Sequence, residues 1–295
     1  VMVAFQFFIS VSLLTATLIV SNQMDFIQNK ELGFDNEEVL AIKLHGDIYT
    51  QATEHTKKVR HELTKNPDIE QVSLVSHLIG DRFGVEHFAL QENPENTFNF
   101  RYVFTDQWFT ETMGLEIKEG NAGNKNSDQI EYILNETAAT SLQTDQLMGK
   151  QAFNSFAETS GKISGIVNDF NFTSLHNAVD PLVIQISSNP QYFGYLLIRL
   201  KTNDIKSTMI KIEKTIAGFA PKDVVISYFI DDKVDQLYRS ENNMFSVFKI
   251  FSATIICLAS LGLFALFAFI SQARTKELGI RKTLGATLGQ LLILM

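Results

Sequence analysis

Cysteine is nearly absent from this sequence, with Cys257 alone among 295 residues. An intramolecular disulfide is therefore excluded, and the stability of the fold has to come from packing. The Gly-Lys-Ser/Thr end of a nucleotide-binding phosphate loop is also missing, because the two Gly-Lys pairs continue as Gly149-Lys150-Gln151 and Gly161-Lys162-Ile163. The chain is thus not expected to hydrolyse a nucleoside triphosphate.

Metal ligands and catalytic nucleophiles in a recognised spacing are missing too. His61-Glu62 begins like a zinc-protease motif, but Lys65 stands where the second imidazole ligand would be. No Gly-x-Ser-x-Gly elbow occurs, and no paired metal spacing joins the other histidines, which are His45, His55, His77, His87 and His176. The formal net charge of −8 argues against a nucleic-acid surface. We predict a non-catalytic protein without cofactor or metal.

Two long uncharged runs stand out instead. Ile250 to Ile270 is long enough to cross a hydrocarbon core of roughly 30 Å at about 1.5 Å per residue, which predicts a transmembrane helix over 250–271. Val1 to Val20 predicts a first transmembrane helix over 1–21. A cleaved signal peptide is the alternative, but it requires a basic n-region and a small-residue cleavage site, and neither is visible.

The two ends of the sequence suggest a piece of a longer polypeptide. The chain starts with Val1 rather than methionine and is already within an apolar run, so we expect further residues upstream. Residues 288–295 are apolar again and are expected to begin another span.

Basic residues decide the predicted orientation. The segment after the second run holds four basic side chains and one acid, which are Arg274, Lys276, Arg281, Lys282 and Glu277. Residues 272–287 are therefore predicted to be cytoplasmic under the positive-inside rule, and residues 22–243 extracytoplasmic, with the folded domain over 22–230. Neither glycine nor proline occurs from Asp231 to Ser260, which predicts an unbroken stalk helix over 231–249 that continues into the span.

Hydrophobic periodicity predicts an α/β domain between the spans. Two strand-helix-strand units are expected, with a smaller inserted lobe at about 130–186 between them. The strand, helix and strand of the first unit are Val39–Leu44, Thr50–Asn66 and Ile69–Leu78. Those of the second unit are Tyr195–Leu200, Ile205–Phe219 and Val224–Phe229. Aromatic residues at Phe98, Phe100, Tyr102 and Phe104 alternate along a further strand and form either a core face or a hydrophobic ligand surface. The predicted fold class is an α+β membrane protein with two transmembrane helices flanking a large extracytoplasmic domain.

These segments also carry a family resemblance. Arg274-Thr-Lys-Glu-Leu-Gly-Ile-Arg-Lys-Thr-Leu-Gly-Ala-Thr287 resembles the cytoplasmic segment of the FtsX-like permease domain, which also directly follows a span. Asn29-Lys-Glu-Leu-Gly-Phe-Asp35, Gly165-Ile-Val-Asn-Asp-Phe-Asn-Phe172 and Asp180-Pro181 are similar to the MacB-type periplasmic core domain. The resemblance covers nearly the whole chain. Some members fuse two such units, and this N-terminus is similar to the start of the second; their permease domain continues through further spans, whereas this chain stops at Met295.

The resemblance implies a permease of a mechanotransmission-type ABC transporter in a bacterial inner membrane. A cytosolic ATPase subunit would bind residues 272–287 and move the stalks, so that a substrate such as an antimicrobial peptide, drug or lipoprotein is exported or released. Other implied partners are a second permease unit, a periplasmic adaptor, an outer-membrane duct and the lipid bilayer. The implied ATPase-coupling residues are Arg274, Lys276, Glu277, Gly279, Arg281, Lys282 and Gly285.

Two alternatives stay open at this point. The charges after the second span can instead anchor the helix end at anionic headgroups, which is compatible with coupling. The two-span plan is also that of an extracytoplasmic ligand-sensing receptor. A receptor is expected to continue into a long cytosolic signalling helix, whereas Gly285 interrupts this segment and an apolar stretch resumes at Leu288, which favours the permease.

Overall fold

The computed structural model describes residues 2–29, 32–35, 38–125, 129–144, 146–155, 158–173, 178–187, 189–276, 280 and 283–285. The chain divides into two compact units. One consists of Glu31–Leu237 and holds the strands of the described part, and the other consists of Val1–Lys30 together with Tyr238–Met295.

An open four-stranded sheet forms one half of the unit Glu31–Leu237. Its strands lie in the order β11 (Ser227–Phe229), β1 (Val39–Lys43), β10 (Tyr195–Leu200) and β2 (Ile69–Val75), and each neighbouring pair is antiparallel. Helices α2 (Gly46–Glu54) and α3 (Thr56–Thr64) join β1 to β2, whereas α6 (Ile205–Phe219) joins β10 to β11. The two strand-helix-strand units therefore interleave, as in a split βαβ fold.

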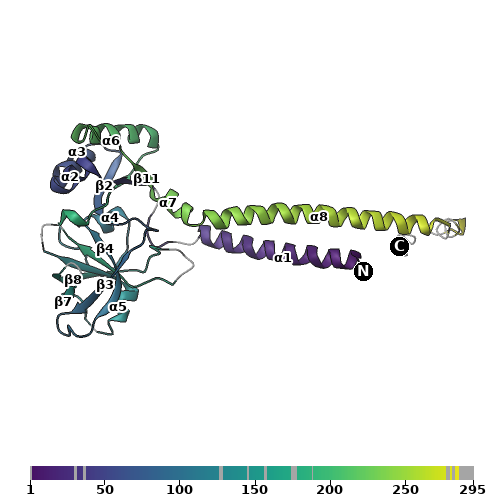
Figure 1. Ribbon diagram of the computed structural model, residues 1–295, viewed down its shortest axis with the longest axis horizontal. Helices are drawn as coiled ribbons and strands as arrows, with labels where there is room; N and C mark the ends of the chain where they lie inside the picture. The colour runs from purple at the N-terminus through teal and green to yellow at the C-terminus, as the bar shows by residue number, and fades with distance from the viewer. Residues whose placement is uncertain are drawn as a thin grey trace. The chain divides into compact units, whose positions relative to one another are not determined.

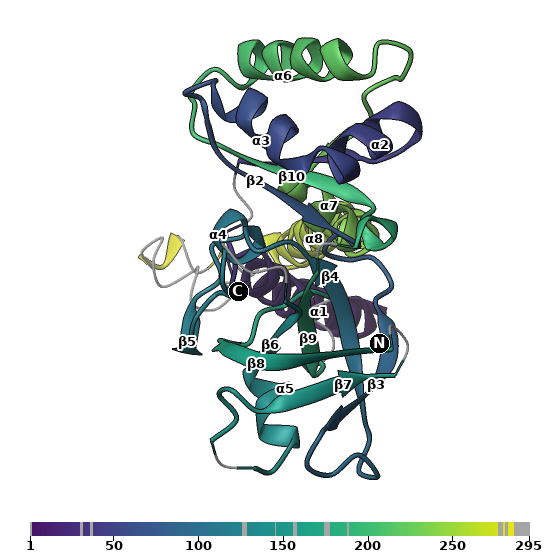
Figure 2. The ribbon, with the colours of Figure 1, turned by 90° about the vertical axis from the view of Figure 1, so that its left-hand side faces the viewer.

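Alternating side chains explain why one face of this sheet carries the helices. Leu40 and Ile42 of β1 are buried with Leu196 of β10 in a cluster that also contains Ile212 and Ile216 of α6. Positions four residues apart lie on the same face of a helix, so α6 presents one apolar stripe to the sheet. Figure 2 shows α2, α3 and α6 on the same side of β2 and β10.

The predicted single helix over Thr50–Asn66 is wrong, because the structure has two helices there. The chain turns at His55, whose backbone angles are φ −120° and ψ 33°, and α2 begins earlier, at Gly46. No glycine or proline marks this break. Tertiary packing decides it, since Ala52 of α2 and Val59 of α3 both enter the cluster beside the sheet.

Six strands of the described part close into a ring. In order around the ring they are β4 (Phe98–Thr105), β3 (Gly84–Leu90), β7 (Gln151–Asn154), β8 (Thr159–Val167), β6 (Glu131–Asn135) and β9 (Leu182–Ile186), and β9 pairs with β4 in parallel. A short strand, β5 (Ile117–Gly120), pairs with β8. Closure of this kind leaves few free strand edges.

The aromatic side chains of β4 fill the interior of the ring. Phe100, Tyr102 and Phe104 are buried in one cluster with Phe88 of β3 and Tyr132 of β6. The rings of Phe88 and Tyr132 meet edge to face with their centroids 5.4 Å apart. Because β3 and β6 are not neighbours, this contact crosses the interior. The prediction that the alternating aromatics form a core face is confirmed.

The ring differs from the lobe expected at about 130–186. β3 and β4, at 84–105, belong to the same ring as β6 to β9, so the later strands do not form a sheet of their own. In the sequence the ring strands lie between β2 and β10. β3 escapes sequence analysis because its first half is largely exposed, at Gly84 and Val85, and only its second half, from Phe88, is buried.

A third buried cluster, which we call the junction core, lies between the open sheet and the ring. It combines Val39 and Leu197, from the sheet face opposite to the helices, with Val103 and Ile184 from the outer face of the ring; further buried members are Phe34, Ile79, Phe83, Met113, Phe170, Phe172 and Ile230. The direct strand pairing between β2 and β4 is limited to Val75 and Thr105. The two halves of the unit are therefore joined mainly by this apolar layer.

Asn135 ties the ring to helix α5 (Glu136–Ser141). Its side chain is fully buried, and its Oδ1 accepts hydrogen bonds from the N–H groups of Ala138 at 3.0 Å and Leu182 at 2.8 Å. Its Nδ2 donates to the carbonyl oxygen of Asp180 at 3.0 Å. The first bond caps α5 and the other two position the start of β9. A single amide therefore fixes two elements and the Asp180-Pro181 segment.

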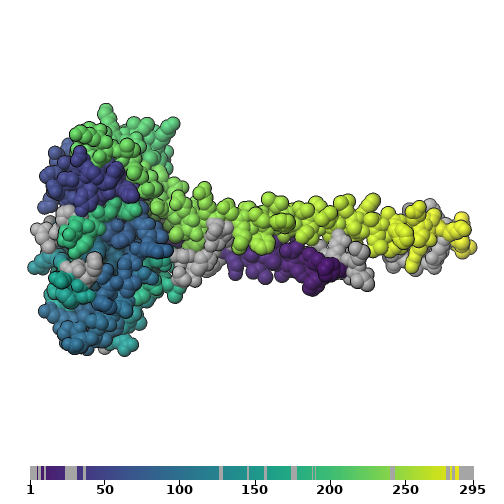
Figure 3. Space-filling view, in the orientation of Figure 1, coloured from purple at the N-terminus to yellow at the C-terminus, as the bar shows by residue number. Residues whose placement is uncertain are grey.

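Two helices form most of the described part of the other unit. α1 (Met2–Asn29) and α8 (Arg239–Ala273) lie side by side (Figure 1), and their side chains meet along this stretch in the space-filling view (Figure 3). The hydroxyl oxygens of Thr17 and Ser252 are 2.5 Å apart, and Ser252 is buried. Small hydroxyl residues allow helices to approach closely and hydrogen-bond in an apolar surrounding.

Of the described helices, α8 alone is long and apolar enough to cross a membrane. The qualifying stretch is Asn243–Ala273, with a mean hydropathy of 2.5, and apolar side chains such as Phe264 and Phe269 are exposed along it. The apolar stretch found within α1 is Val11–Gln23, which is shorter than a span. The second predicted span thus has a matching helix, while the first stays a prediction.

The unbroken stalk helix predicted from Asp231 is wrong. Residues Ile230–Leu237 form a separate helix, α7, and α8 begins at Arg239 after Tyr238, whose backbone angles are φ −107° and ψ 9°. Neither glycine nor proline causes this break. α7 instead packs into the junction core through Ile230 and Val234, so tertiary contacts override local helix propensity.

Replacing Asn135 by alanine tests its role in the ring. Asn135→Ala should lower the free energy of unfolding by roughly 3 kcal/mol, because it removes a helix cap and leaves the buried N–H of Leu182 without its acceptor. Chemical denaturation of the full chain in detergent measures this loss. The matched change at the exposed Asn96 should stay within about 0.5 kcal/mol of the wild type; equal effects of the two changes would contradict the assignment.

Candidate functional site

The predicted ATPase-coupling residues lie at and beyond the end of α8. The N–H of Arg274 donates to the carbonyl oxygen of Ile270 at 3.0 Å, and both Arg274 and Lys276 are exposed. Gly285 has a φ of 95°, a left-handed conformation that glycine adopts without strain. The other four residues of the set lie outside the described residues, namely Glu277, Gly279, Arg281 and Lys282. Their coupling role stays a prediction.

The structure does bring together two of the segments that carry the resemblance. Gly33, with a φ of 82°, lies so close to the segment after β8 that a Cβ atom there would stand 2.8 Å from the carbonyl oxygen of Asp169. The N–H of Asn171 donates to the carbonyl oxygen of Leu32 at 2.7 Å. The rings of Phe34 and Phe170 meet edge to face with centroids 6.3 Å apart. Residues 32–35, which we call the linker, are thus held against residues 169–171.

Arg199 clamps the end of the linker. This arginine of β10 is buried, and its Nη1 and Nη2 donate to Oδ2 and the carbonyl oxygen of Asp35 at 2.6 and 2.9 Å. Its Nε donates to the carbonyl oxygen of Thr112 at 2.7 Å. The planar guanidinium group suits such a fixed, multiple contact. The linker is therefore attached to the central strand of the open sheet by charge as well as by packing.

Helix α7 reaches the same core from the other end of the unit. Ile230 is buried in the junction core and Val234 packs against it. Gly80 has a φ of 83°, and a Cβ atom there would lie 2.9 Å from the Leu237 side chain. The N–H of Gly80 donates to the carbonyl oxygen of Phe172 at 3.0 Å. Glycine at position 80 thus allows α7 to pass close to the residues that also hold the linker.

The linker and α7 therefore share one apolar core, although nearly 200 residues of sequence separate them. Phe170 and Phe172 contact each other at 5.6 Å between centroids and link the two attachments. A small apolar cavity of about 20 Å³ lies beside them, lined in part by Phe83, Met113 and Ile230. A displacement of either chain segment must shift this packed layer, because packed interiors transmit strain.

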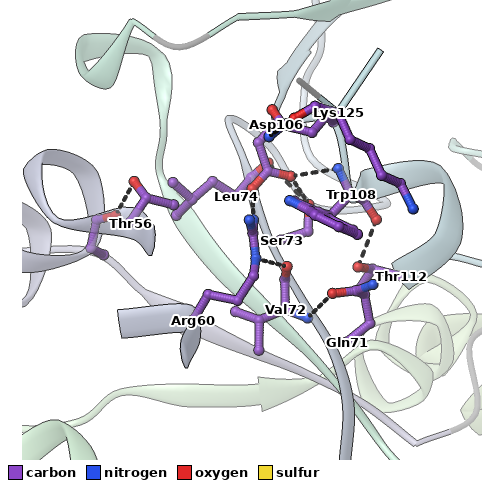
Figure 4. Close-up of polar contacts among 12 residues, drawn as sticks. Thr56, Arg60, Gln71, Val72, Ser73, Leu74, Asp106, Trp108, Thr112 and Lys125 are labelled. Atoms are coloured by element: carbon purple, nitrogen blue, oxygen red, sulfur yellow. Dashed lines mark hydrogen bonds and ion pairs between the residues drawn. The ribbon is translucent and has the colours of Figure 1, made fainter. Parts of the chain in front are cut away.

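A buried charge cluster covers the free edge of β2 (Figure 4). Arg60 of α3 donates from Nη2 to Oδ2 of Asp106 at 2.5 Å and from Nε to the carbonyl oxygen of Val72 at 3.0 Å. The other carboxylate oxygen of Asp106 accepts hydrogen bonds from the Ser73 hydroxyl at 2.7 Å and the Trp108 N–H at 3.1 Å. Asp106 directly follows β4, so the cluster connects the ring to the helical layer of the open sheet.

Burial opposes the charge on both members of this pair. It raises the pKa of the Asp106 carboxyl group and lowers the pKa of the Arg60 guanidinium group, while the attraction between the two charges opposes each shift. The ring of Trp108 lies against Arg60, with its centroid 4.8 Å from the guanidinium carbon. Each charge therefore depends on the other to remain buried.

Three solved structures have folds similar to this chain. One is the periplasmic region of MacB from Actinobacillus actinomycetemcomitans, with 12% identity, a TM-score of 0.48 and coverage of 72% of this chain and 97% of that one. A domain of a putative permease protein from Porphyromonas gingivalis has 12% identity, a TM-score of 0.44 and coverage of 63% and 85%. The extracellular domain of the noncanonic ABC-type transporter YknZ from Gram-positive bacteria has 10% identity, a TM-score of 0.45 and coverage of 64% of this chain and 98% of that one.

Two of these neighbours are described as parts of a putative permease and of an ABC-type transporter. Comparison of the sequence with protein-family models and with curated proteins gives no match.

Sequence reasoning missed Arg60, Asp106 and Arg199 as structural contacts. Each is an ordinary charged residue, and its oppositely charged partner lies at least 46 residues away in the sequence. The one available signal is an arginine at position 199 within an otherwise apolar strand, where a buried charge requires a partner.

Replacing Arg199 by methionine tests the clamp. Arg199→Met keeps much of the apolar stem but removes all three donors to Asp35 and Thr112. We expect the amide of Asp35, which bonds the carbonyl oxygen of Met113, to exchange with solvent about tenfold faster or more. Hydrogen exchange with mass spectrometry measures this rate over residues 32–35. The exposed Arg82 offers a matched control, and an Arg82→Met variant with the same acceleration would argue against the clamp.

Replacing Asp106 by asparagine tests the buried pair. Asp106→Asn puts an NH2 donor in place of one of two accepting oxygens, so either Arg60 or the Ser73 and Trp108 donors lose their acceptor, and the free energy of unfolding should fall by about 1–3 kcal/mol. Asp180→Asn is the matched control, since it breaks the more exposed pair with Arg101 and should cost less than about 1 kcal/mol. Denaturation followed by the fluorescence of Trp108 measures both. Similar losses in the two variants would contradict a special role for Asp106.

The same pair predicts a pH dependence. Since the folded pKa of Asp106 is raised, its contribution to stability is full below the ordinary aspartate pKa and is lost as the pH rises through the raised value. Asp106 should therefore cause part of the fall in the free energy of unfolding with rising pH. In Asp106→Asn this part should be absent when denaturation is measured over that pH range. An unchanged pH profile in the variant would refute the raised pKa.

Proposed function

We propose that this chain is a permease subunit of a mechanotransmission-type ABC transporter. In this proposal a separate cytosolic ATPase acts on the segment after α8, and the unit Glu31–Leu237 lies outside the cytoplasm and changes shape to export or release a substrate. The chain itself carries no catalytic step. The neighbouring permease structures agree with a permease subunit.

The shared attachment of the linker and α7 supports this proposal most directly. Both segments lead toward the unit that contains the helix suited to cross a membrane, and both end in the junction core. A force applied along either segment would reach the same layer between the open sheet and the ring. A domain that had only to bind a ligand beside the membrane has no need for two attachments at its centre.

The membrane topology belongs to the proposal. α8 supplies one span over Asn243–Ala273, and α1 would supply the other, with the Thr17–Ser252 contact holding them together. Arg274 and Lys276 follow α8 directly and are exposed, as coupling to an acidic partner surface requires. A second permease unit, a periplasmic adaptor and an outer-membrane duct remain partners inferred from the sequence resemblance.

A ligand-sensing receptor would share the two attachments, because it too moves helices from outside the membrane. The two functions differ in what binds beyond α8. A permease needs an ATPase at residues 272–287, whereas a receptor needs its own signalling helices there.

Charge reversal in the coupling segment tests the proposal. Arg281→Glu with Lys282→Glu in the full-length protein should abolish co-purification of the ATPase, because the two glutamates would repel the carboxylates on the partner that the two cations attract. Insertion into the membrane should not change. Lys206→Glu with Lys214→Glu makes the same charge change on exposed positions of α6 and should leave the ATPase bound. Unchanged ATPase association in the first variant would remove the coupling assignment.

A further inference from the structure

A cleft separates the helical layer of the open sheet from the ring. Its volume is about 410 Å³, within the range of roughly 300–1,000 Å³ typical of small-molecule sites. One side is lined by residues 53–58 and Arg60, from the end of α2 and the first part of α3, and the other by Asp106, Gln107 and Ser187. The cleft lies away from the junction core and contacts both halves of the unit.

The cleft is positively charged, although the chain as a whole is acidic. Its lining includes three cationic side chains, of Lys57, Lys58 and Arg60, and two carboxylates, of Glu54 and Asp106. The complete chain, in contrast, carries a net charge of −8. Asp106 is already neutralised by Arg60 and accepts hydrogen bonds on both oxygens, so it offers little to a cation. Lys57 and Lys58 are exposed at the opening. The charge distribution therefore favours an anionic ligand.

The start of α3 adds to this preference. Lys57 and Lys58 occupy its first turn, which contains no acidic residue, and His55 at the N-cap makes no capping hydrogen bond through its side chain. The N-terminus of a helix carries partial positive charge, so the ammonium groups of two lysines in the first turn are repelled by this charge. An anion in the cleft would relieve this repulsion.

We propose that this cleft binds a small molecule through a phosphate or carboxylate group. Lys57 and Lys58 contact the anionic group at the opening, and the guanidinium group of Arg60 lies at the floor beside Asp106. Because its walls come from both halves of the unit, a bound molecule also holds the open sheet against the ring. The proposal does not depend on the transporter function, since binding is measurable without an ATPase.

Equilibrium dialysis tests the site directly. The full chain in detergent is dialysed against radiolabelled pyrophosphate or citrate at constant ionic strength, which separates the phosphate and carboxylate sources of the same chemistry. We expect saturable binding of at least one probe. In Lys57→Gln with Lys58→Gln the affinity should fall at least about tenfold, because charge-assisted hydrogen bonds are lost. Lys206→Gln with Lys214→Gln on α6 should bind as the wild type does.

The fluorescence of Trp108 places the ligand within the molecule. Trp108 is the only tryptophan of the chain and packs against Arg60, so binding of a ligand in the cleft should change its fluorescence emission. The change should be half complete at the ligand concentration that gives half-saturation in dialysis. Saturable binding that is weakened only by the Lys57 and Lys58 changes supports the proposal. Absence of saturable binding for both probes, or equal weakening by the two pairs of changes, overturns it.

Discussion

The apolar layer between the open sheet and the ring is the constraint on which the rest of the unit Glu31–Leu237 depends. Direct strand pairing between β2 and β4 is confined to Val75 and Thr105, so hydrogen bonding alone would leave the two halves loosely joined. Packing around Phe170 and Phe172 joins them instead and also receives the linker and α7. Stability of the domain and transmission of movement are therefore properties of the same set of contacts.

Charged residues act at the border of this layer rather than inside it. Arg199 attaches the linker to β10, and Arg60 and Asp106 cover the part of β2 that has no neighbouring strand. An uncovered strand edge invites pairing with another chain, so covering it protects the domain as well as closing it. The same Arg60 lies at the floor of the positively charged cleft. One buried pair thus links the integrity of the sheet to the site where we place a ligand.

Periodic patterns in the sequence predicted most elements, and long-range contacts account for what they missed. The alternating aromatics of β4 marked a core face, and the apolar run after Ile250 marked α8, because in both cases the local pattern and the environment agree. The break at Tyr238 and the turn at His55 have no local signal, since packing of distant residues causes them. Ring closure, Arg199 and Asp106 depend on partners far away in the sequence. Local sequence patterns do not specify contacts between such distant residues.

The order of the strands along the chain has a consequence for the way this protein is made. β1 and β2 emerge from the ribosome before β10 and β11, yet both pair with β10, and β1 also pairs with β11, as in the register of Leu40 with Phe229. The ring strands lie between them in the sequence and can complete their own pairings first. The open sheet therefore forms only after nearly the whole domain has been synthesised. Contacts so distant in sequence slow folding, and until they form, the apolar faces of β1 and β2 are exposed to aggregation or to a chaperone.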